Sequence, residues 1–375
     1  QMCIRDSPIT VLKGEQIETS KNTHWSKKIT LNPGYIDRNF LQVPNGATWA
    51  DVTFTTGDMD GLRRIVMHTV QEIPGQSFSE SGTREYITMR DNDTQVQSFE
   101  VTGGRTIELA IAQFWSSLGK TELTVNATFH GIKPDSHSLH IDAARLVTQV
   151  DITAPLGTEA VDPSGSFKIV RKTIAPSNFK PRPLTDPRDS LPSNRRIYEA
   201  ELSYSFSLSK KTTVTPQPAL ALEDQFHESW ESLIWMLYDK SKRFIASGSS
   251  GSRGSSSLSK GDYILKFHVR NHELKHLKKL KDMPLNLDLK LAKPISLKFH
   301  NDPNDALTGG NGFPSGALGG GNQTRIYIEQ PSPMPTEAST GDLLLGSISY
   351  GQSKSNLIGS GKKPDGFPIS MRVPP

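Results

Sequence analysis

Cysteine is almost absent from this sequence, since Cys3 is the only one among 375 residues. A single cysteine cannot form a disulfide within the chain, which excludes a disulfide-stapled secreted scaffold. Cys3 also lies in the opening QMCIRDS, residues 1–7, which resembles a translated sequencing adapter and is interpreted as an artefact. A fold without cysteine is compatible with a reducing compartment, so we expect a cytoplasmic protein.

Long apolar runs and an excess of one charge are also missing. No stretch approaches the roughly 18 apolar residues that a membrane-spanning helix needs, and residues 1–10 lack the apolar part of a secretory signal. The 43 Lys and Arg nearly balance the 39 Asp and Glu, leaving a net charge of +4. This balance argues against a basic nucleic-acid-binding surface. We therefore expect no membrane span and no nucleic-acid partner.

The sequence is rich in strands that alternate apolar and polar residues with a period of two, as half-buried β-strands do. The clearest examples are 123–130, 263–270 and 285–291. Further strands are expected at 49–55, 64–72, 98–102, 106–113, 198–206, 233–238 and 343–350. Together with 30 glycines and 25 prolines to supply turns, this pattern predicts an all-β chain of sandwiches.

Two local features can be predicted in more detail. Strand 233–238 and residues 243–246 indicate a hairpin in which Asp239 closes the turn, with a helix over 226–242 as the alternative. One short helix is expected over 271–281. It would be capped by Asn271 and would bury one stripe of leucines: Leu274, Leu277 and Leu280.

Three stretches look irregular. Residues 176–192 are rich in proline and charge and are interpreted as an extended excursion. Residues 247–257 (SGSSGSRGSSS) and 309–321 (GGNGFPSGALGGG) are low-complexity segments and are interpreted as loop insertions. Neither lies between a strand and a helix, as a phosphate-binding loop would.

The sharpest chemical motif is HExxH, formed by His272, Glu273 and His276. On a helix it would place two histidines on one zinc ion, with the glutamate as general base. However, no third ligand follows at a usual spacing, and the leucine stripe already explains the helix. His268 lies on the preceding strand and should point elsewhere. We therefore predict no metal site, and a zinc peptidase stays only as an alternative.

Other catalytic constellations are missing from the sequence. No nucleophilic serine between a strand and a helix, dinucleotide fingerprint or phosphate loop can be found, so we predict no catalytic and no cofactor-binding residues. His130, at a strand end before Gly131, is interpreted as a turn residue rather than a base. Four tryptophans could bind a sugar or peptide, although core packing is the more ordinary role: Trp49, Trp115, Trp230 and Trp235.

Six segments lie along the chain in this order: 43–52 (VPNGATWADV), 104–118 (GRTIELAIAQFWSSL), 129–132 (FHGI), 191–199 (LPSNRRIYE), 260–263 (KGDY) and 280–284 (LKDMP). This ordered set resembles the tripeptidyl-peptidase II family of subtilisin-like serine peptidases. The resemblance runs from about residue 8 to residue 375. It is patchier after residue 299, and it departs from the family pattern at 247–257, at 309–321 and at His276.

This resemblance implies a non-catalytic region that follows the subtilisin domain. The expected parts are the end of a first immunoglobulin-like domain (8–24), a galactose-binding-like jelly roll (25–134) and a second immunoglobulin-like sandwich (135–375) with one short helix. Such a family member is a cytosolic exopeptidase that removes tripeptides from free peptide N-termini and assembles into large homo-oligomers. Its catalytic residues lie outside the segments matched here, and both ends of the chain look truncated.

The sequence therefore favours a β-sandwich region that serves assembly and access to the active site of a serine tripeptidyl-peptidase. Its expected partners are further copies of itself and the peptide substrates that the subtilisin domain handles. The alternative is a carbohydrate- or peptide-binding module without peptidase function, in which the loops of the first sandwich hold the ligand.

Overall fold

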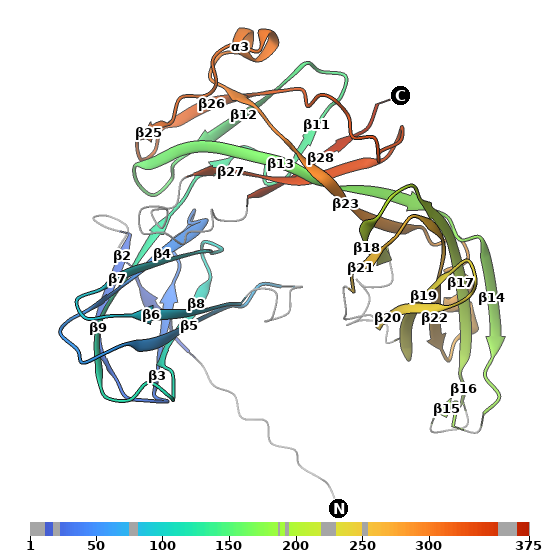
Figure 1. Ribbon diagram of the computed structural model, residues 1–375, viewed down its shortest axis with the longest axis horizontal. Coiled ribbons are helices and arrows are strands. Elements are labelled where there is room, and N and C mark those ends of the chain that lie inside the picture. The colour runs from blue at the N-terminus through green and yellow to red at the C-terminus, as the bar shows by residue number, and fades with distance from the viewer. Residues whose placement is uncertain are drawn as a thin grey trace, which may run out of the picture.

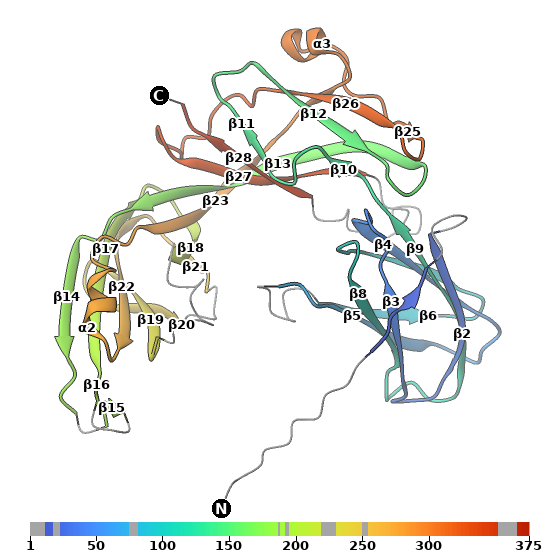
Figure 2. The same ribbon diagram turned by 180° about the vertical axis from the view of Figure 1, so that it is seen from behind.

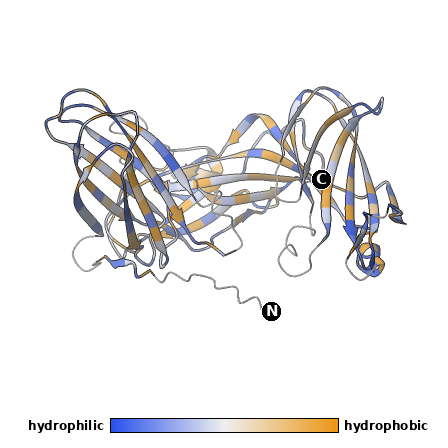
Figure 3. Cartoon of the chain, turned by 90° about the horizontal axis from the view of Figure 1, so that it is seen from below, coloured by the Kyte–Doolittle hydropathy of each residue, from blue (hydrophilic) through white to orange (hydrophobic). Residues whose placement is uncertain are grey.

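The computed structural model of the chain describes residues 12–17, 23–74, 82–186, 188–191, 195–218, 230–249, 254–351 and 366–374. Most of them lie in strands, which confirms the all-β prediction. The strands form three β units arranged as an arch, with the second unit between the first and the third (Figures 1 and 2). Hydrophobic and hydrophilic residues alternate along the strands (Figure 3). No helix in the described ranges is long and apolar enough to cross a membrane.

The first unit is a sandwich of two sheets around one core. One sheet has the order β1 (Glu15–Gln16), β3 (Ile36–Gln42), β8 (Thr106–Gln113), β5 (Arg63–Gln71) and β6 (Thr83–Met89). The other has the order β2 (His24–Leu31), β9 (Thr121–His130), β4 (Trp49–Thr56) and β7 (Thr94–Glu100). Phe54, Ile111 and Val125 are fully buried between them. The alternation therefore assigned the inward faces of these strands correctly.

The first unit begins earlier than expected. Residues 8–24 are predicted to end a preceding domain, yet β1, which lies among them, pairs in parallel with β3 of the first unit. Trp25 Nε1 also donates to Glu15 Oε2 at 2.9 Å. The described part of 8–24 is thus an edge of the first sandwich, while residues 1–7 lie outside the described ranges.

Residues 135–375, expected to form one sandwich, contain two separate buried cores. One sheet of the second unit has the order β10 (Lys133–Pro134), β12 (Val147–Thr153), β26 (Gln323–Glu329) and β24 (Phe299–His300). The large sheet has the order β11 (Leu139–Ile141), β28 (Phe367–Arg372), β27 (Leu343–Gly351), β13 (Glu159–Ile174), β23 (Leu285–Ser296), β18 (Thr212–Pro218) and β21 (Ser256–Leu258), with β25 (Gly316–Leu318) also paired to β13.

The third unit adds a five-stranded sheet in the order β14 (Asn178–Pro183), β17 (Tyr198–Leu208), β22 (Gly261–Asn271), β19 (Ser232–Asp239) and β20 (Phe244–Ser249). A small ladder joins β15 (Ser190–Leu191) to β16 (Arg195–Arg196), and the helices are α2 (Leu274–Lys278) and α3 (Pro303–Thr308). Strands β13 and β23 pass from the second core into the third, because Phe167 and Leu291 belong to the second while Ile174 and Leu287 contact the third. These shared strands explain why the sequence reads as one long sandwich.

The stretches predicted as irregular contain strands. Within 176–192, β14 is an edge strand paired only with β17, a position where prolines are tolerated. Within 309–321, β25 pairs with β13 and buries Leu318. Segment 247–257 includes the end of β20 and the start of β21, and Gly248 packs so closely on Trp235 that a Cβ there would lie 2.6 Å from the indole. Residues 250–253 lie outside the described ranges.

The predicted hairpin is confirmed. β19 and β20 pair in antiparallel fashion, and Asp239 accepts hydrogen bonds from the backbone N (2.9 Å) and the Nε (2.8 Å) of Arg243. The alternative helix over 226–242 is wrong wherever this segment is described, from residue 230 onward. Here a strong β pattern and a turn-forming aspartate agree, so the local prediction holds.

Candidate functional site

The HExxH segment does not form a helix with both histidines on one face. α2 has only five residues and begins at Leu274, so His272 and Glu273 precede it. The expected cap, Asn271, ends strand β22, and its Oδ1 accepts from Glu273 N at 2.7 Å, because it lies two residues before the N-cap position, Glu273. The predicted helix over 271–281 is therefore wrong at both ends, although it exists at its centre.

Three histidines near this segment each contact a carboxylate. His268 Nδ1 lies 3.4 Å from Glu199, and His272 Nδ1 lies 2.8 Å from Glu231 while its Nε2 lies 3.9 Å from Glu273 Oε1. His276 Nε2 lies 3.5 Å from Glu273, whose Oε2 is also 2.8 Å from the ammonium of Lys275. That ammonium is the main reason why the pKa of Glu273 is lowered. In the described ranges no three His, Cys, Asp or Glu side chains are placed to hold a metal ion.

The leucine stripe explains the position of α2. Leu277 is completely buried and Leu280 is 8% exposed, both in the third core together with Met283. Tyr204, also buried in this core, donates its hydroxyl to the carbonyl of Met283 at 2.8 Å. Burial raises the pKa of Tyr204, which keeps that hydroxyl protonated as a donor. Packing of these side chains, rather than metal binding, accounts for the local structure.

A buried polar cluster joins the first and second units. We name it the junction cluster: Asp51 on β4, His130 at the end of β9 and Glu159 at the start of β13. His130 Nδ1 lies 3.0 Å from Glu159 Oε2, and its Nε2 lies 3.5 Å from Asp51 Oδ2. The three residues are 3–8% exposed. The sequence interpretation of His130 as a turn residue is wrong, because this side chain is buried between two carboxylates.

Trp49 and Gly131 complete the junction. Trp49 lies on a strand of the first unit, but its ring packs in the second core and stacks on His130 with ring centres 5.1 Å apart. The N–H of Gly131 donates to Glu159 Oε1 at 3.2 Å. A Cβ at Gly131 would lie 2.2 Å from the carbonyl oxygen of Gly46, so only glycine allows this close approach of the two backbones.

The contacts of the junction cluster hold two units together and do not activate a nucleophile. Both carboxylates face one imidazole, and Ser98 donates to Asp51 rather than receiving activation from His130. No geometry here matches the nucleophile–base–orienter order of a hydrolase. Its hydrogen bonds and ring stacking fix the orientation of the first unit relative to the second. In the sequence only Asp51 stands out, as a carboxylate between the apolar residues Ala50 and Val52, and it does not show which groups it contacts.

The four candidate tryptophans lie in different environments. Trp49 and Trp235 are 3% and 4% exposed, and Trp230 is half-buried. Trp115 is 72% exposed, on the loop after β8. Its neighbour Phe114 contacts the Trp115 ring at 5.8 Å and the guanidinium of Arg64 at 5.0 Å. Only Trp115 among the four is placed to contact a ligand directly.

Comparison with known proteins gives a consistent result. A family model described as "Tripeptidyl peptidase II" matches residues 154–338, and one described as "TPPII, galactose-binding domain-like" matches residues 31–119. Tripeptidyl-peptidase 2 of Arabidopsis thaliana is 30% identical over 386 residues, covering 98% of this chain and 27% of that protein. The Drosophila melanogaster protein of the same name is 28% identical over 326 residues, covering 83% of this chain and 22% of that protein.

A solved structure agrees along nearly the whole chain. The crystal structure of tripeptidyl peptidase 2 matches with a TM-score of 0.84 and 25% identity, covering 97% of this chain and 31% of that one. The chain thus spans about a quarter of the length of the curated relatives named here. The match to the galactose-binding-like model falls on the first unit.

Proposed function

The chain belongs to the tripeptidyl peptidase II family, and from that premise we propose that it is a non-catalytic β region of a serine tripeptidyl-peptidase. In this proposal the whole enzyme removes tripeptides from the free N-termini of peptides, in the cytoplasm. The region described here orients neighbouring domains and limits access to an active site formed elsewhere in the enzyme. The whole protein self-associates into a large homo-oligomer.

The observation that carries the proposal is the structural match over 97% of this chain at a TM-score of 0.84. A match of that extent includes the relative placement of the three β units, not only the fold of each one. The junction cluster supports the architectural role, because a buried clamp between units costs desolvation and is useful where their orientation must be maintained.

A complementation experiment tests this proposal. The purified chain alone should release no fluorophore from Ala-Ala-Phe-aminocoumarin, since no nucleophile with a positioned base was found in the described ranges. The Arabidopsis relative, deleted for the region that aligns with this chain, should lose activity and large assemblies, and replacement by this chain should restore both. Restored assembly size can be measured by light scattering after gel filtration. A deleted enzyme that keeps full activity and size would contradict the proposal.

A binding module is the second candidate, and the exposure of Trp115 favours it. An indole that is 72% exposed and held beside Phe114 can stack on a sugar ring or a peptide side chain. Binding to a glycan or peptide array that is lost in Trp115→Ala would support this candidate. Trp49 no longer belongs to it, because its ring is buried in the second core.

A further inference from the structure

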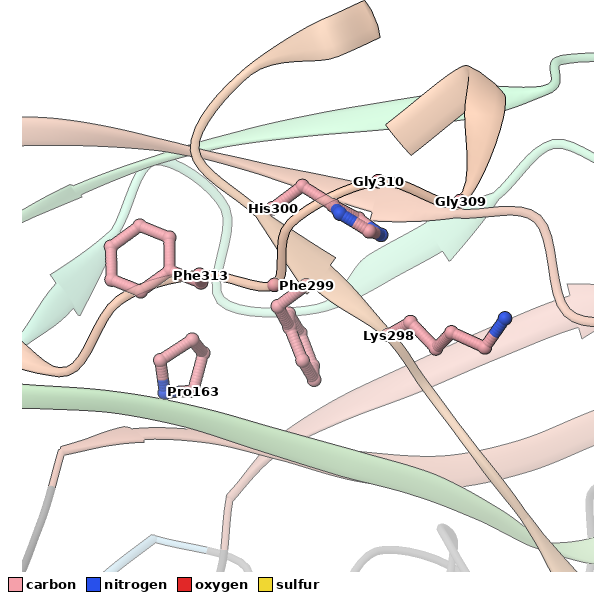
Figure 4. Close-up of a pocket in the computed structure, with 8 residues that line it drawn as sticks. Pro163, Lys298, Phe299, His300, Gly309, Gly310 and Phe313 are labelled. Atoms are coloured by element: carbon pink, nitrogen blue, oxygen red, sulfur yellow. The ribbon is translucent and has the colours of Figure 1, made fainter. Parts of the chain in front are cut away.

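A cavity of about 400 Å³ opens on the second unit, beside α3 and β24. One wall is apolar and consists of Pro163, Phe299 and Phe313 (Figure 4). The other wall carries the side chains of Lys298 and His300. A volume of this size is in the range of sites for small molecules, roughly 300–1,000 Å³. It is therefore large enough for one residue of a peptide.

His300 supplies an unused hydrogen-bond acceptor. Its Nδ1 lies 2.8 Å from the carbonyl oxygen of Asn311, which can only accept, so Nδ1 carries the proton. In the neutral imidazole Nε2 is then an acceptor, yet it is buried without a hydrogen-bond partner. His300 is only 2% exposed, and its Nε2 lies 3.6 Å from Glu329 Oε2, which is also an acceptor. Glu329 is partly exposed and its oxygens bind Lys298, so the atom that lacks a partner is His300 Nε2, and a ligand N–H placed beside it would supply the missing donor.

Lys298 supplies donors on the same wall. Its ammonium lies 3.0 and 3.1 Å from the two oxygens of Glu329, an arrangement that leaves hydrogen-bonding capacity on the nitrogen. The lysine and the glutamate also cancel each other's charge. The polar wall therefore offers an acceptor and a donor without net charge, which suits a neutral amide better than an ion.

The loop that frames the cavity is held in place. Phe313 N donates to the carbonyl of Phe299 at 2.6 Å, and Asp302 caps α3 by accepting from Asn304 N at 2.7 Å. A Cβ at Gly310 would lie 2.2 Å from Asp305 Oδ1, so a larger residue here would displace the Asp305 carboxylate. The glycines of 309–321 thus shape a wall instead of forming a featureless insertion.

We propose that this cavity binds a peptide segment through one amide group and the apolar side chain next to it. The amide N–H donates to His300 Nε2, and the amide carbonyl accepts from Lys298. The apolar side chain packs on Phe299, Phe313 and Pro163. The inference rests on the chemistry of the cavity and is independent of the proposed function, although a peptidase would give such a site an obvious ligand.

A matched pair of small ligands tests the acceptor role on the unmodified 375-residue chain. N-methyl-3-phenylpropanamide has the N–H, the carbonyl and an apolar ring, whereas methyl 3-phenylpropanoate has an ester oxygen in place of the N–H. We expect the amide to bind about tenfold tighter, because a site built to pair with an N–H rejects an analogue without it. Binding is measured by NMR shifts of the Gly310 and Phe313 amides. Equal affinities, or no shifts at these amides up to about 10 mM ligand, a concentration that covers millimolar affinities, would overturn the proposal.

Variants then assign the roles. His300→Leu should remove the preference for amide over ester, and Lys298→Met should weaken both ligands. The matched control is Lys293→Met, an exposed lysine on β23 that should leave both affinities unchanged. The capped peptide Ac-Gly-Phe-Gly-NH2 should displace the small amide, whereas a failure to displace it would show a site for small amides only and contradict the peptide assignment. If His300→Leu does not fold, the ligand pair on the unmodified chain still decides.

Discussion

His130 at the junction and His276 beside α2 are both flanked by carboxylates, but they lie in opposite surroundings. His130 is buried between Asp51 and Glu159, from strands far apart in the sequence. His276 lies in a local motif whose glutamate is 37% exposed and bound by a lysine. The HExxH spacing that can be recognised in the sequence thus belongs to the partly exposed histidine. The residues of the junction cluster lie far apart in the sequence and form no motif. Burial, rather than motif, indicates which polar groups matter for the fold.

The largest effect should come from the apolar residue that holds α2 in place. Leu277→Ala removes a completely buried side chain from the third core, and we expect it to cost about 3–5 kcal/mol of stability. The measurement is the apparent unfolding temperature, together with hydrogen exchange of the β22 and β17 amides. Unchanged protection of these strands would mean that α2 is not part of the third core.

A smaller loss is expected when the junction cluster is broken. Glu159→Ala leaves His130 Nδ1 and Gly131 N buried without their acceptor, at a cost of about 2–3 kcal/mol. The matched control is Glu273→Ala, which removes a carboxylate that also contacts a histidine but is more exposed. The control should leave the unfolding temperature unchanged. Equal effects of the two substitutions would refute the contrast between the two clusters.

The same contrast explains how much of the fold could be predicted. Strands such as β4, β8 and β22 pack one face on a core, so their alternation in the sequence revealed them. Strand β13 was missed because its first half carries Pro163 and Gly165 and because its two ends pack in two different cores. The complete junction cluster could not be predicted, because the contact of Glu159 with His130 depends on how the first and second units dock.

Acid should weaken the third unit through Glu199. Burial acts to raise the pKa of this carboxyl, but hydrogen bonds from Arg182 and Arg270 and the nearby His268 outweigh it and lower the pKa. A lowered pKa in the folded state gives stability that is present above the ordinary value near 4.5 and is lost as pH falls through the folded pKa. Unfolding temperatures measured from pH 6 down to pH 3 should fall, and Glu199→Gln should flatten that fall. Glu122→Gln, an exposed carboxylate on β9, is the control with the same change of charge and should leave the pH profile as it is.

The smallest effect should come from His276, the residue that the motif makes most conspicuous. Its Nε2 contacts Glu273 at 3.5 Å, and that carboxylate keeps the ammonium of Lys275 as a partner when the imidazole is removed. His276→Ala should therefore cost about 0.5 kcal/mol or less, as substitutions outside a core or a buried network usually do. Metal analysis of the purified chain should find no equimolar zinc, because Glu231 binds His272 Nδ1 and the ammonium of Lys275 binds the Glu273 carboxylate that lies between the two histidines. Equimolar zinc that disappears in His276→Ala, with a matching fall in unfolding temperature, would reverse the ranking of the two clusters and restore the zinc peptidase alternative.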